Sequence, residues 1–452
     1  MSVAIIAFAA PSLAGAETLP DALAAAYRNN PTLEAARLSA ASADENTAQA
    51  RAAYLPSVDV TASTGVRESS TETAGAGTTT QNTEPRTASV IAQQALYTGG
   101  FRGAQSAAAR ASVARSRENL RAVEQDVMLA AISAYVDVLR DQEFVRIRTA
   151  DVTLLERQLE EARARFDVGD VTLTDVSQAE ARLAGSRSGL SQAQSALEGS
   201  RARYVQIVGE APGELVLPPP PPALPASLDE AVERALDSNP DIRDARANER
   251  LASAQVGIER SALLPQLTAV ARWDESEDSN GPDVRGDSAS AVAQLTIPLF
   301  EGGFARSRVR QSRIEEQRAA SLTEQAERAV VSQLTAAWND YLAAERVVFS
   351  SQEQVRANEL AFEGVQEERS VGLRTSLDVL NAQQELLNAQ LAVASAQRDA
   401  YVATHAVLQA IGLLDAGALG VNVPLYDPDQ HARAVGHTIL STQPALDIRG
   451  RE

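Results

Sequence analysis

The stretch Thr18–Pro56 reads TLPDALAAAYRNNPTLEAARLSAASADENTAQARAAYLP, and the stretch Ser227–Pro265 reads SLDEAVERALDSNPDIRDARANERLASAQVGIERSALLP. Both contain Asn-Pro and end on Leu-Pro, and the matching positions lie 209 residues apart. Further along, Gly99-Gly100-Phe101 and Gly302-Gly303-Phe304 match at a spacing of 203 residues. The chain therefore contains one unit of about 200 residues twice, which is the signature of a repeat architecture.

The composition of the 452 residues excludes several classes of function. The chain is 44% apolar but only 4% aromatic, has no Cys and carries a net charge of −19. An acidic surface argues against nucleic acid as a partner. All 41 basic residues are Arg, so lysine chemistry is excluded together with thiol chemistry. The three His lack metal-ligand spacing, and we find no nucleophile–base set or cofactor loop. We therefore predict no cofactor, no metal and no enzymatic activity.

The N-terminus has the pattern of an export signal. Val3–Ala10 is a short apolar run, and Ala14-Gly15-Ala16 precedes Glu17. This order is typical of a secretory signal peptide with an A-x-A cleavage site, although a positively charged start is missing. We expect residues 1–16 to be the signal peptide. No other stretch reaches the ~18 apolar residues of a membrane helix, so the sequence predicts that any membrane-spanning part consists of strands.

Each unit begins with a helix and continues with strands. The first helix is predicted over residues 19–53, with a break at Pro31. From Val58 apolar and polar residues alternate, which is typical of a strand. The polar stretch Glu68–Pro85 is predicted to be a loop, and Ala88–Tyr97 a returning strand. The β-hairpins of the two units are thus expected at about 57–97 and 266–300, followed by strand-to-helix bends at Gly99, Gly100, Gly302 and Gly303.

A very long helix follows each hairpin. The expected ranges are about 102–167 and 305–371, with apolar residues three and four apart. About 65 residues at 1.5 Å each make a helix of about 100 Å. Turns at Gly169 and Gly372 then lead into returning helices at about 172–208 and 375–411. The fold class expected is mainly α with a small β part, built as two tandem repeats of helical hairpins, each with a β-hairpin.

The two repeats and the linker between them define the domain organisation. Repeat 1 covers residues 17–210 and repeat 2 covers residues 227–413. Residues 211–226 form a stiff linker that contains Pro218–Pro222. Residues 414–452 are expected to form a C-terminal equatorial segment, with a mobile tail from His431 onwards.

The duplicated motifs resemble the TolC family of outer-membrane channel-tunnel proteins over about residues 19–413. The resemblance rests on the Asn-Pro helix start, the Leu-Pro before each hairpin, the Gly-Gly-Phe bend after it, and the Val-Gly turn followed by Asp-Val. It implies a homotrimer with a helical tunnel, or α-barrel, in the periplasm and a shared twelve-stranded β-barrel in the outer membrane. It also implies a passive exit duct for type I protein secretion or multidrug efflux. Its partners would be a periplasmic adaptor (membrane fusion) protein, an inner-membrane ABC or RND-type pump, and outer-membrane lipid.

The resemblance also implies a periplasmic gate at the helical turns. The turns that would contact the adaptor are Val168-Gly169-Asp170 and Val371-Gly372-Leu373. By position, Glu160 is the gate carboxylate, Arg374 the gate arginine and Asp378 the ring aspartate. The sequence departs from the family at Arg369, where the family has Tyr, and at Asn381, where it has a second acid.

Two simpler interpretations remain open for these residues. Thr172-x-x-Asp175 and Thr375-x-x-Asp378 also read as capping boxes, which place an acid at a helix N-terminus. Glu160 and Arg374 also suit a solvated surface pair. For the whole protein, the alternative to a conduit is an exported coiled-coil scaffold or adaptor, which would have no need of alternating β-hairpins.

Overall fold

The computed structural model describes residues 16–75, 77–279, 283–435 and 441–442. The predicted signal peptide therefore lies outside the described residues, apart from Ala16. The chain divides into two compact units. Unit 1 contains the residues up to Leu38, Glu118–Arg243 and Ala326–Asp427, and unit 2 contains Ser39–Arg117, Asp244–Gln325 and the residues from Pro428.

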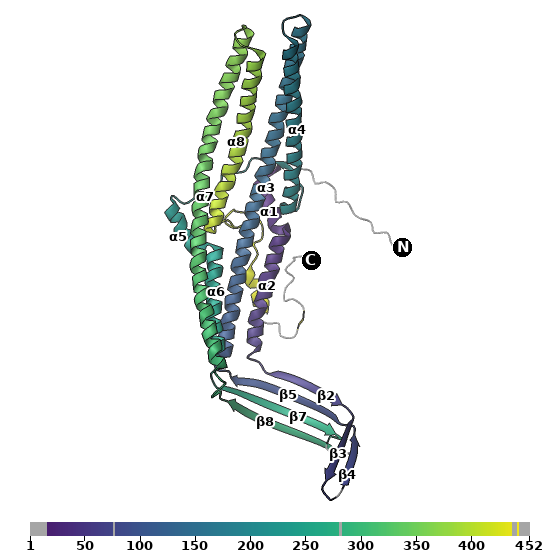
Figure 1. Ribbon diagram of the computed structural model, residues 1–452. Coiled ribbons are helices and arrows are strands. Elements are labelled where there is room, and N and C mark those ends of the chain that lie inside the picture. The colour runs from purple at the N-terminus through teal and green to yellow at the C-terminus, as the bar shows by residue number, and fades with distance from the viewer. Residues whose placement is uncertain (1–15, 76, 280–282, 436–440, 443–452) are drawn as a thin grey trace, which may run out of the picture. The chain divides into compact units, whose positions relative to one another are not determined.

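The helices follow the predicted order in both repeats (Figure 1). They are α1 (Leu19–Asn29), α2 (Pro31–Ala52), α3 (Phe101–Asp167), α4 (Leu173–Val208), α5 (Leu228–Ser238), α6 (Pro240–Ser261), α7 (Phe304–Ser370), α8 (Ser376–Ile411) and α9 (Pro428–Val435). Both long helices, α3 and α7, have 67 residues, and both returning helices, α4 and α8, have 36. The mainly helical fold with tandem helical hairpins is confirmed. None of the described helices combines the length and the apolarity needed to cross a membrane.

The Asn-Pro motif has the same structural role in both repeats. Pro31 and Pro240 are the first residues of α2 and α6, where a missing N–H is harmless. The buried Asn30 side chain accepts the N–H groups of Thr32 and Leu33 and donates to the Ile207 carbonyl at 2.9 Å. Asn239 repeats this pattern, donating to the Ala410 carbonyl at 2.9 Å. One amide thus caps a helix and ties it to the end of the returning helix.

The core of unit 1 is made where the helices of each repeat pack together. Tyr135 and Tyr204 are fully buried, and their ring centroids lie 6.5 Å apart. The Tyr135 hydroxyl donates to the Val216 carbonyl, which joins α3 to the short parallel pair β1 (Ala16–Glu17) and β6 (Glu214–Leu215). In the second repeat, one apolar cluster contains Ala231, Ala235, Ile242, Val330, Leu334, Val407 and Ile411.

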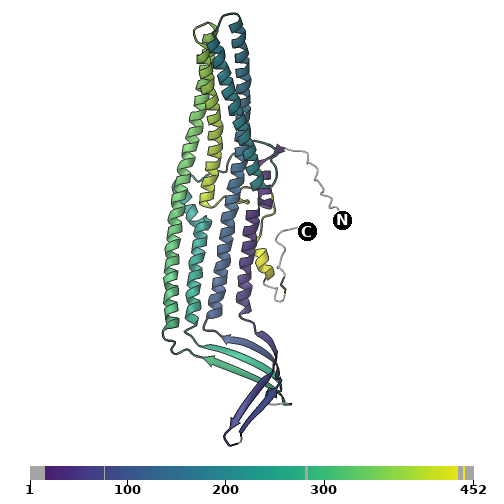
Figure 2. The ribbon, with the colours of Figure 1, turned by 45° about the vertical axis from the view of Figure 1, so that its right-hand side comes forward.

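Unit 2 contains a four-stranded antiparallel sheet with the order β2-β5-β7-β8 (Figures 1 and 2). Its strands are β2 (Ser57–Thr64), β5 (Arg86–Tyr97), β7 (Gln266–Glu277) and β8 (Arg285–Thr296). The two hairpins therefore join through β5 and β7 into one sheet. Strand β8 ends at Thr296, whereas the alternation in the sequence predicts a strand that continues to Leu299. Pro298 has no N–H to donate to a neighbouring strand, so the strand ends before it.

The prediction of a loop over Glu68–Pro85 is wrong. This stretch contains a second antiparallel hairpin, β3 (Arg67–Thr73) and β4 (Gly77–Thr83), with pairs such as Ser70↔Thr80 and Thr71↔Thr79. Threonine is β-branched and favours strands. The described side chains of both strands are almost all exposed, so no apolar alternation marks them in the sequence.

The register gives the four-stranded sheet two different faces. Directly paired residues share a face, so Val60, Val90 and Trp273 lie on the same side. Up to Trp273 that face is apolar apart from Gln94: it carries Val58, Val60, Ala62, Ala88, Val90, Ala92, Leu267, Ala269, Ala271, Trp273, Ala289, Ala291, Ala293 and Leu295. Beyond Trp273 the same face is polar and charged, with Thr64, Arg86, Glu275, Glu277, Arg285 and Asp287. The opposite face carries Ser, Thr and Gln side chains with Asp59, Arg272 and Asp274, and also Ile91, Val270 and Val292.

The C-terminal segment is more ordered than the sequence suggests. A mobile tail was predicted from His431 onwards, but residues 428–435 form α9 and His431 is 4% exposed. The His431 ring nitrogen Nδ1 lies 3.3 Å from Oδ2 of the buried Asp44 on α2. Arg117 on α3 contacts both Asp44 and Asp429. The prediction is therefore wrong for residues 431–435, whereas residues 436–440 and 443–452 lie outside the described part.

Candidate functional site

Both helical hairpins end in the same turn. Gly169 and Gly372 have φ values of 79° and 80°, a left-handed conformation that favours glycine. In the first turn the Asp170 N–H donates to the Arg165 carbonyl, and in the second the Leu373 N–H donates to the Glu368 carbonyl. These bonds close Schellman motifs, which satisfy the carbonyls at the helix ends. The predicted turn residues are therefore held at equivalent positions in the two repeats.

Apolar side chains project from these turns into solvent. Val168 is 80% exposed, and Val371 and Leu373 are 70% and 75% exposed. Phe166, Leu173 and Leu377 lie in the flanking helices and are also exposed. Exposed apolar side chains that gather at one place mark an interaction site more often than isolated ones do. Asp170 is not free, since it forms an ion pair with Arg165 at 2.6 Å.

The capping boxes predicted after both turns are confirmed. The Thr172 side chain accepts the Asp175 N–H while the Asp175 carboxylate accepts the Thr172 N–H, and Thr375 and Asp378 do the same. The hydrogen bonds from Thr375 to the carboxylate, first from its backbone and then from its side chain, lower the pKa of Asp378. Asp378, which is half-buried, is therefore held as an anion at the start of α8.

The other predicted gate residues Arg374, Arg369 and Asn381 each have a polar partner, and that of Arg374 is not Glu160. Arg374 pairs with Glu368 at 2.7 Å on its own hairpin. Arg369 pairs with Glu161 at 2.7 Å, and Asn381 accepts a hydrogen bond from Arg182 at 2.8 Å. These last two contacts join the second helical hairpin to the first.

Glu160 is exposed, and no hydrogen bond or ion pair holds it among the residues that the structure describes. The acid that bridges the hairpins is its neighbour Glu161. One residue along a helix turns a side chain by about 100°, so positional matching alone does not decide which of two adjacent acids faces the partner helix. Glu161, Glu368 and Arg182 are the partner residues that were not predicted from the sequence.

The strand-to-helix bends have left-handed backbones. Gly99, Gly100, Gly302 and Gly303 all have φ values between 61° and 90°. A Cβ at Gly99 would lie 2.7 Å from the Ser261 carbonyl oxygen, so only glycine fits there. These residues direct the chain from the sheet into α3 and α7, as predicted.

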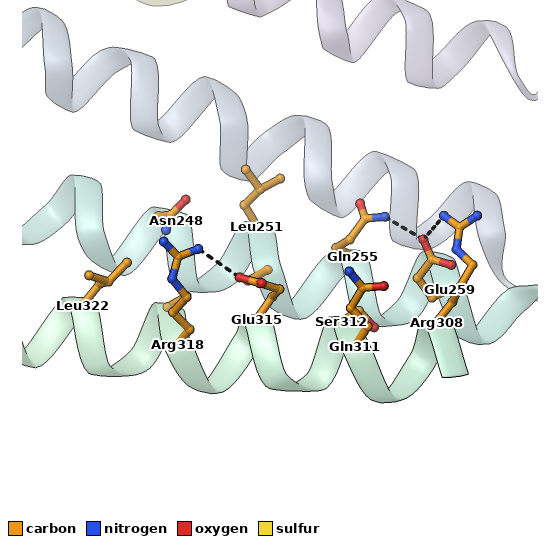
Figure 3. Close-up of a pocket in the computed structure, with 12 residues that line it drawn as sticks. Asn248, Leu251, Gln255, Glu259, Arg308, Gln311, Ser312, Glu315, Arg318 and Leu322 are labelled. Carbon is orange, nitrogen blue, oxygen red and sulfur yellow. Dashed lines mark hydrogen bonds and ion pairs between the residues drawn. The ribbon is translucent and has the colours of Figure 1, made fainter. Parts of the chain in front are cut away.

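A groove lies between α6 and α7 in unit 2 (Figure 3). Leu251 and Leu322 form part of its lining, together with the charged side chains of Glu259, Arg308, Glu315 and Arg318. Those charges already pair with each other, Arg308 with Glu259 at 2.8 Å and Arg318 with Glu315 at 3.1 Å. No group of three or more metal-ligating side chains occurs within the described ranges. The groove therefore has no evident catalytic chemistry.

Comparisons with known proteins agree with this architecture. The family model described as outer membrane efflux protein matches residues 22–210 and 231–413, once in each repeat. The outer membrane efflux protein BepC of Brucella suis biovar 1 (strain 1330) is 34% identical over 420 residues, which cover 93% of this chain and 90% of that protein. The outer membrane protein TolC of Vibrio cholerae serotype O1 is 26% identical over 416 residues, covering 88% and 91%.

A solved structure shows the same fold. The CmeC outer membrane channel of Campylobacter jejuni matches with a TM-score of 0.78 at 15% identity, covering 96% of this chain and 90% of that chain. The chain therefore belongs to the outer membrane efflux protein family, the TolC-like channels of the outer membrane with a long periplasmic helical part.

Proposed function

We propose that this protein is a passive exit duct across the outer membrane and the periplasm, used for type I protein secretion or multidrug efflux. The observation that carries the proposal is the two-faced sheet of unit 2. Up to Trp273, one face presents Val, Ala and Leu on all four strands with Gln94 as the exception, and beyond Trp273 it becomes charged; the other face presents mainly Ser, Thr and Gln. Strands of a transmembrane barrel alternate in this way, with apolar side chains towards lipid and polar ones towards the lumen.

The same sheet supports a trimer. Within one chain β2 and β8 are the two edges of the sheet. Unpaired backbone groups are very unfavourable in lipid, so spanning strands must close into a barrel. Four strands are too few, because the smallest natural barrels have about eight. We propose that three copies pair β8 with β2 of the next copy and share one barrel of twelve strands.

Aromatic side chains support the placement of this sheet in the membrane. Trp273 lies on the apolar face towards the far end of the sheet. Tyr97 and Phe300 lie close to the bends that lead into the long helices, and both are exposed. Aromatic residues concentrate at the two membrane–water interfaces. The apolar face between them is the part that would contact outer-membrane lipid.

The helical turns are the proposed periplasmic entrance. We propose that Val168, Gly169, Asp170, Val371, Gly372 and Leu373 contact a periplasmic adaptor protein, which links the duct to an inner-membrane ABC or RND-type pump. Their exposed apolar side chains support this role. The proposed gate contains Glu160, Arg369, Arg374, Asp378 and Asn381. The assignment of Arg369 and Asn381 to the gate is supported by their contacts with Glu161 and Arg182 on the other hairpin.

The experiment that tests the proposal is a conductance measurement with a mass measurement on the same sample. The detergent-purified protein is added to a planar bilayer, and its oligomeric mass is determined by light scattering. We expect discrete openings that favour cations, because three copies bring three Asp378 anions together near one axis. The mass should correspond to a trimer.

The opposite result would also be informative. A monomer or dimer that never conducts would contradict the duct and favour an exported helical scaffold. An exposed, two-faced sheet would then need another partner, since a soluble protein rarely leaves such an apolar surface uncovered.

A further inference from the structure

Three arginines form a stripe near the start of α7, directly after the bend that leaves the sheet. Arg306, Arg310 and Arg313 are four and three residues apart. Residues at these spacings lie on the same face of a helix. All three side chains are exposed. We call these three residues the arginine stripe.

The charge of the arginine stripe is not compensated within the chain. Across the ranges that the structure describes, no ion pair or hydrogen bond holds any of its three guanidinium groups. Their neighbour Arg308 differs, because it pairs with Glu259 at 2.8 Å. The sequence has no acid between Glu301 and Glu315. In a chain with a net charge of −19, the stripe is thus a local positive surface that is available to an anion.

The packing of α7 keeps the stripe apart from the groove between α6 and α7. Ala305, Val309 and Ser312 are buried, and each precedes one arginine of the stripe by one residue. Arg308 and Gln311, which line the groove, come one residue before Val309 and Ser312. One residue turns a helix by about 100°, so the stripe and the groove lie on opposite sides of the buried face.

Exposed apolar side chains mark the bend beside the stripe. Leu299 and Phe300 are 87% and 88% exposed, and Phe304, the first residue of α7, is 65% exposed. They lie where the chain passes from the sheet into α7 (Figure 1). Aromatic residues with basic residues beside them are typical of a protein surface at a membrane–water interface.

The height of the stripe along α7 matches the layer of lipid headgroups. At 1.5 Å per residue, Arg306 lies about 3 Å and Arg313 about 14 Å from the start of the helix. The headgroup layer extends roughly 5–8 Å beyond the hydrocarbon core. Helical side chains tilt towards the helix N-terminus, which is the sheet end here, and the long arginine stem extends this reach.

The duplication provides an internal comparison. The positions 203 residues before the stripe are Gly103, Ala107 and Arg110. The first repeat therefore has one arginine of the three, although it has the same bend and the matching Phe101. The stripe is not a general consequence of the repeated fold, and it belongs to α7 alone.

We propose that the arginine stripe binds the anionic headgroups of phospholipids in the periplasmic leaflet of the outer membrane. Guanidinium groups suit this ligand, because they stay charged and donate two parallel hydrogen bonds to phosphate oxygens. The inference rests on the proposed duct function. It adds a preference for one lipid class, which the apolar face of the sheet cannot provide because acyl chains are alike in all classes.

The test is a lipid titration of the full-length protein purified in detergent. Phosphatidylglycerol or phosphatidylcholine with the same acyl chains is added, and bound lipid is counted by native mass spectrometry. We expect the protein to bind phosphatidylglycerol more tightly. The triple variant Arg306→Gln, Arg310→Gln and Arg313→Gln should bind it roughly 100-fold more weakly, since each arginine near an anionic lipid surface contributes about fivefold. Its binding of phosphatidylcholine should not change.

A matched control removes the same charge elsewhere. Arg157, Arg203 and Arg346 are exposed and lie in the other compact unit, and none of them has an ion pair among the described residues. Replacing these three with Gln should leave the binding of phosphatidylglycerol unchanged. Each single variant of the stripe should lose about fivefold, and the single variants serve if the triple variant does not assemble.

The outcomes separate this proposal from its alternatives. Equal affinity of the wild type for the two lipids would overturn it, and so would an equal loss in the triple variant and the control. A triple variant that dissociates in lipid-free detergent, while the control keeps the mass of the wild type, would show that the stripe binds a second copy of the chain instead. A wild type that never conducts in a planar bilayer would overturn the duct function, whereas the lipid titration does not depend on conduction.

Discussion

At the scale of single residues, a half-buried carboxylate away from the membrane contributes to how stability depends on pH. Glu124 on α3 accepts the N–H of Ala416 at 2.9 Å, and burial raises its pKa. A folded-state pKa above the unfolded value of about 4.3 means that folding favours the protonated acid. This contribution to stability is present below pH about 4.3 and is lost as the pH rises through the folded-state pKa.

Glu124→Gln should therefore stabilise the protein at neutral pH. The amide oxygen can still accept the Ala416 N–H, while the buried charge is removed. We expect a higher melting temperature at pH 8 and little difference at pH 4, measured by thermal denaturation of the purified protein. Glu233→Gln, at an exposed position on α5, should leave the melting temperature unchanged at both values. A lower melting temperature of Glu124→Gln at pH 8 would show that the charge is favourable, through Arg37 or Arg121.

At the scale of elements, the two strand-to-helix bends look identical in sequence but differ in their surroundings. Gly99 and Gly302 both have a φ of 61°. A Cβ at Gly99 would lie 2.7 Å from the Ser261 carbonyl oxygen and 2.8 Å from Cβ of Leu264. A Cβ at Gly302 would meet nothing within 4 Å. The first bend is packed against the end of α6, and the second is open within the chain.

The same substitution should thus have unequal effects at the two bends. Gly302→Ala should destabilise by about 1 kcal/mol, the usual cost of a left-handed non-glycine residue. Gly99→Ala adds a steric overlap with backbone and should destabilise clearly more. Chemical denaturation of the two variants measures the difference. Equal losses would mean that another copy of the chain covers Gly302 in the assembled protein.

At the scale of the whole molecule, we expect the two faces of the sheet to contact different environments, lipid on one face and the water-filled lumen on the other. Ser290 and Ala291 are neighbours on β8, and both are exposed within one chain. Ser290 shares its face with Arg272, and Ala291 shares its face with Ala271. If the barrel forms as proposed, Ser290 faces the lumen and Ala291 faces lipid.

Arginine at these two positions distinguishes the faces. Ala291→Arg should destabilise the membrane-inserted trimer by about 2–4 kcal/mol, as charged residues do on the lipid face of a barrel. Ser290→Arg should leave assembly intact and shift the ion selectivity of the channel towards anions. Urea titration of the folded trimer in lipid, followed by gel mobility, measures the first effect. Similar losses in both variants would contradict the two-faced barrel.

Much of the fold was predictable because its signals are local. Helix periodicity, the Asn-Pro starts, the capping boxes at Thr172 and Thr375 and the Gly turns each depend on residues close together in the chain. The hairpin β3–β4 was not predictable in this way, since its strands are polar on both faces and lack an apolar alternation. The order of α9 was missed for a related reason, because burial of His431 against Asp44 depends on a residue far away in sequence.

The sequence by itself determined the duplication, the long helices, the alternating strands and the family. Only the tertiary structure decided which residues meet across the hairpins: Glu161 with Arg369, Arg182 with Asn381, and Gln383 with Asp151. The physical reason is that periodicity fixes which residues share a face of one helix, but the rotation and axial position of a second helix are set by packing over its whole length. A contact between two helices therefore depends on many residues at once, and no short motif encodes it.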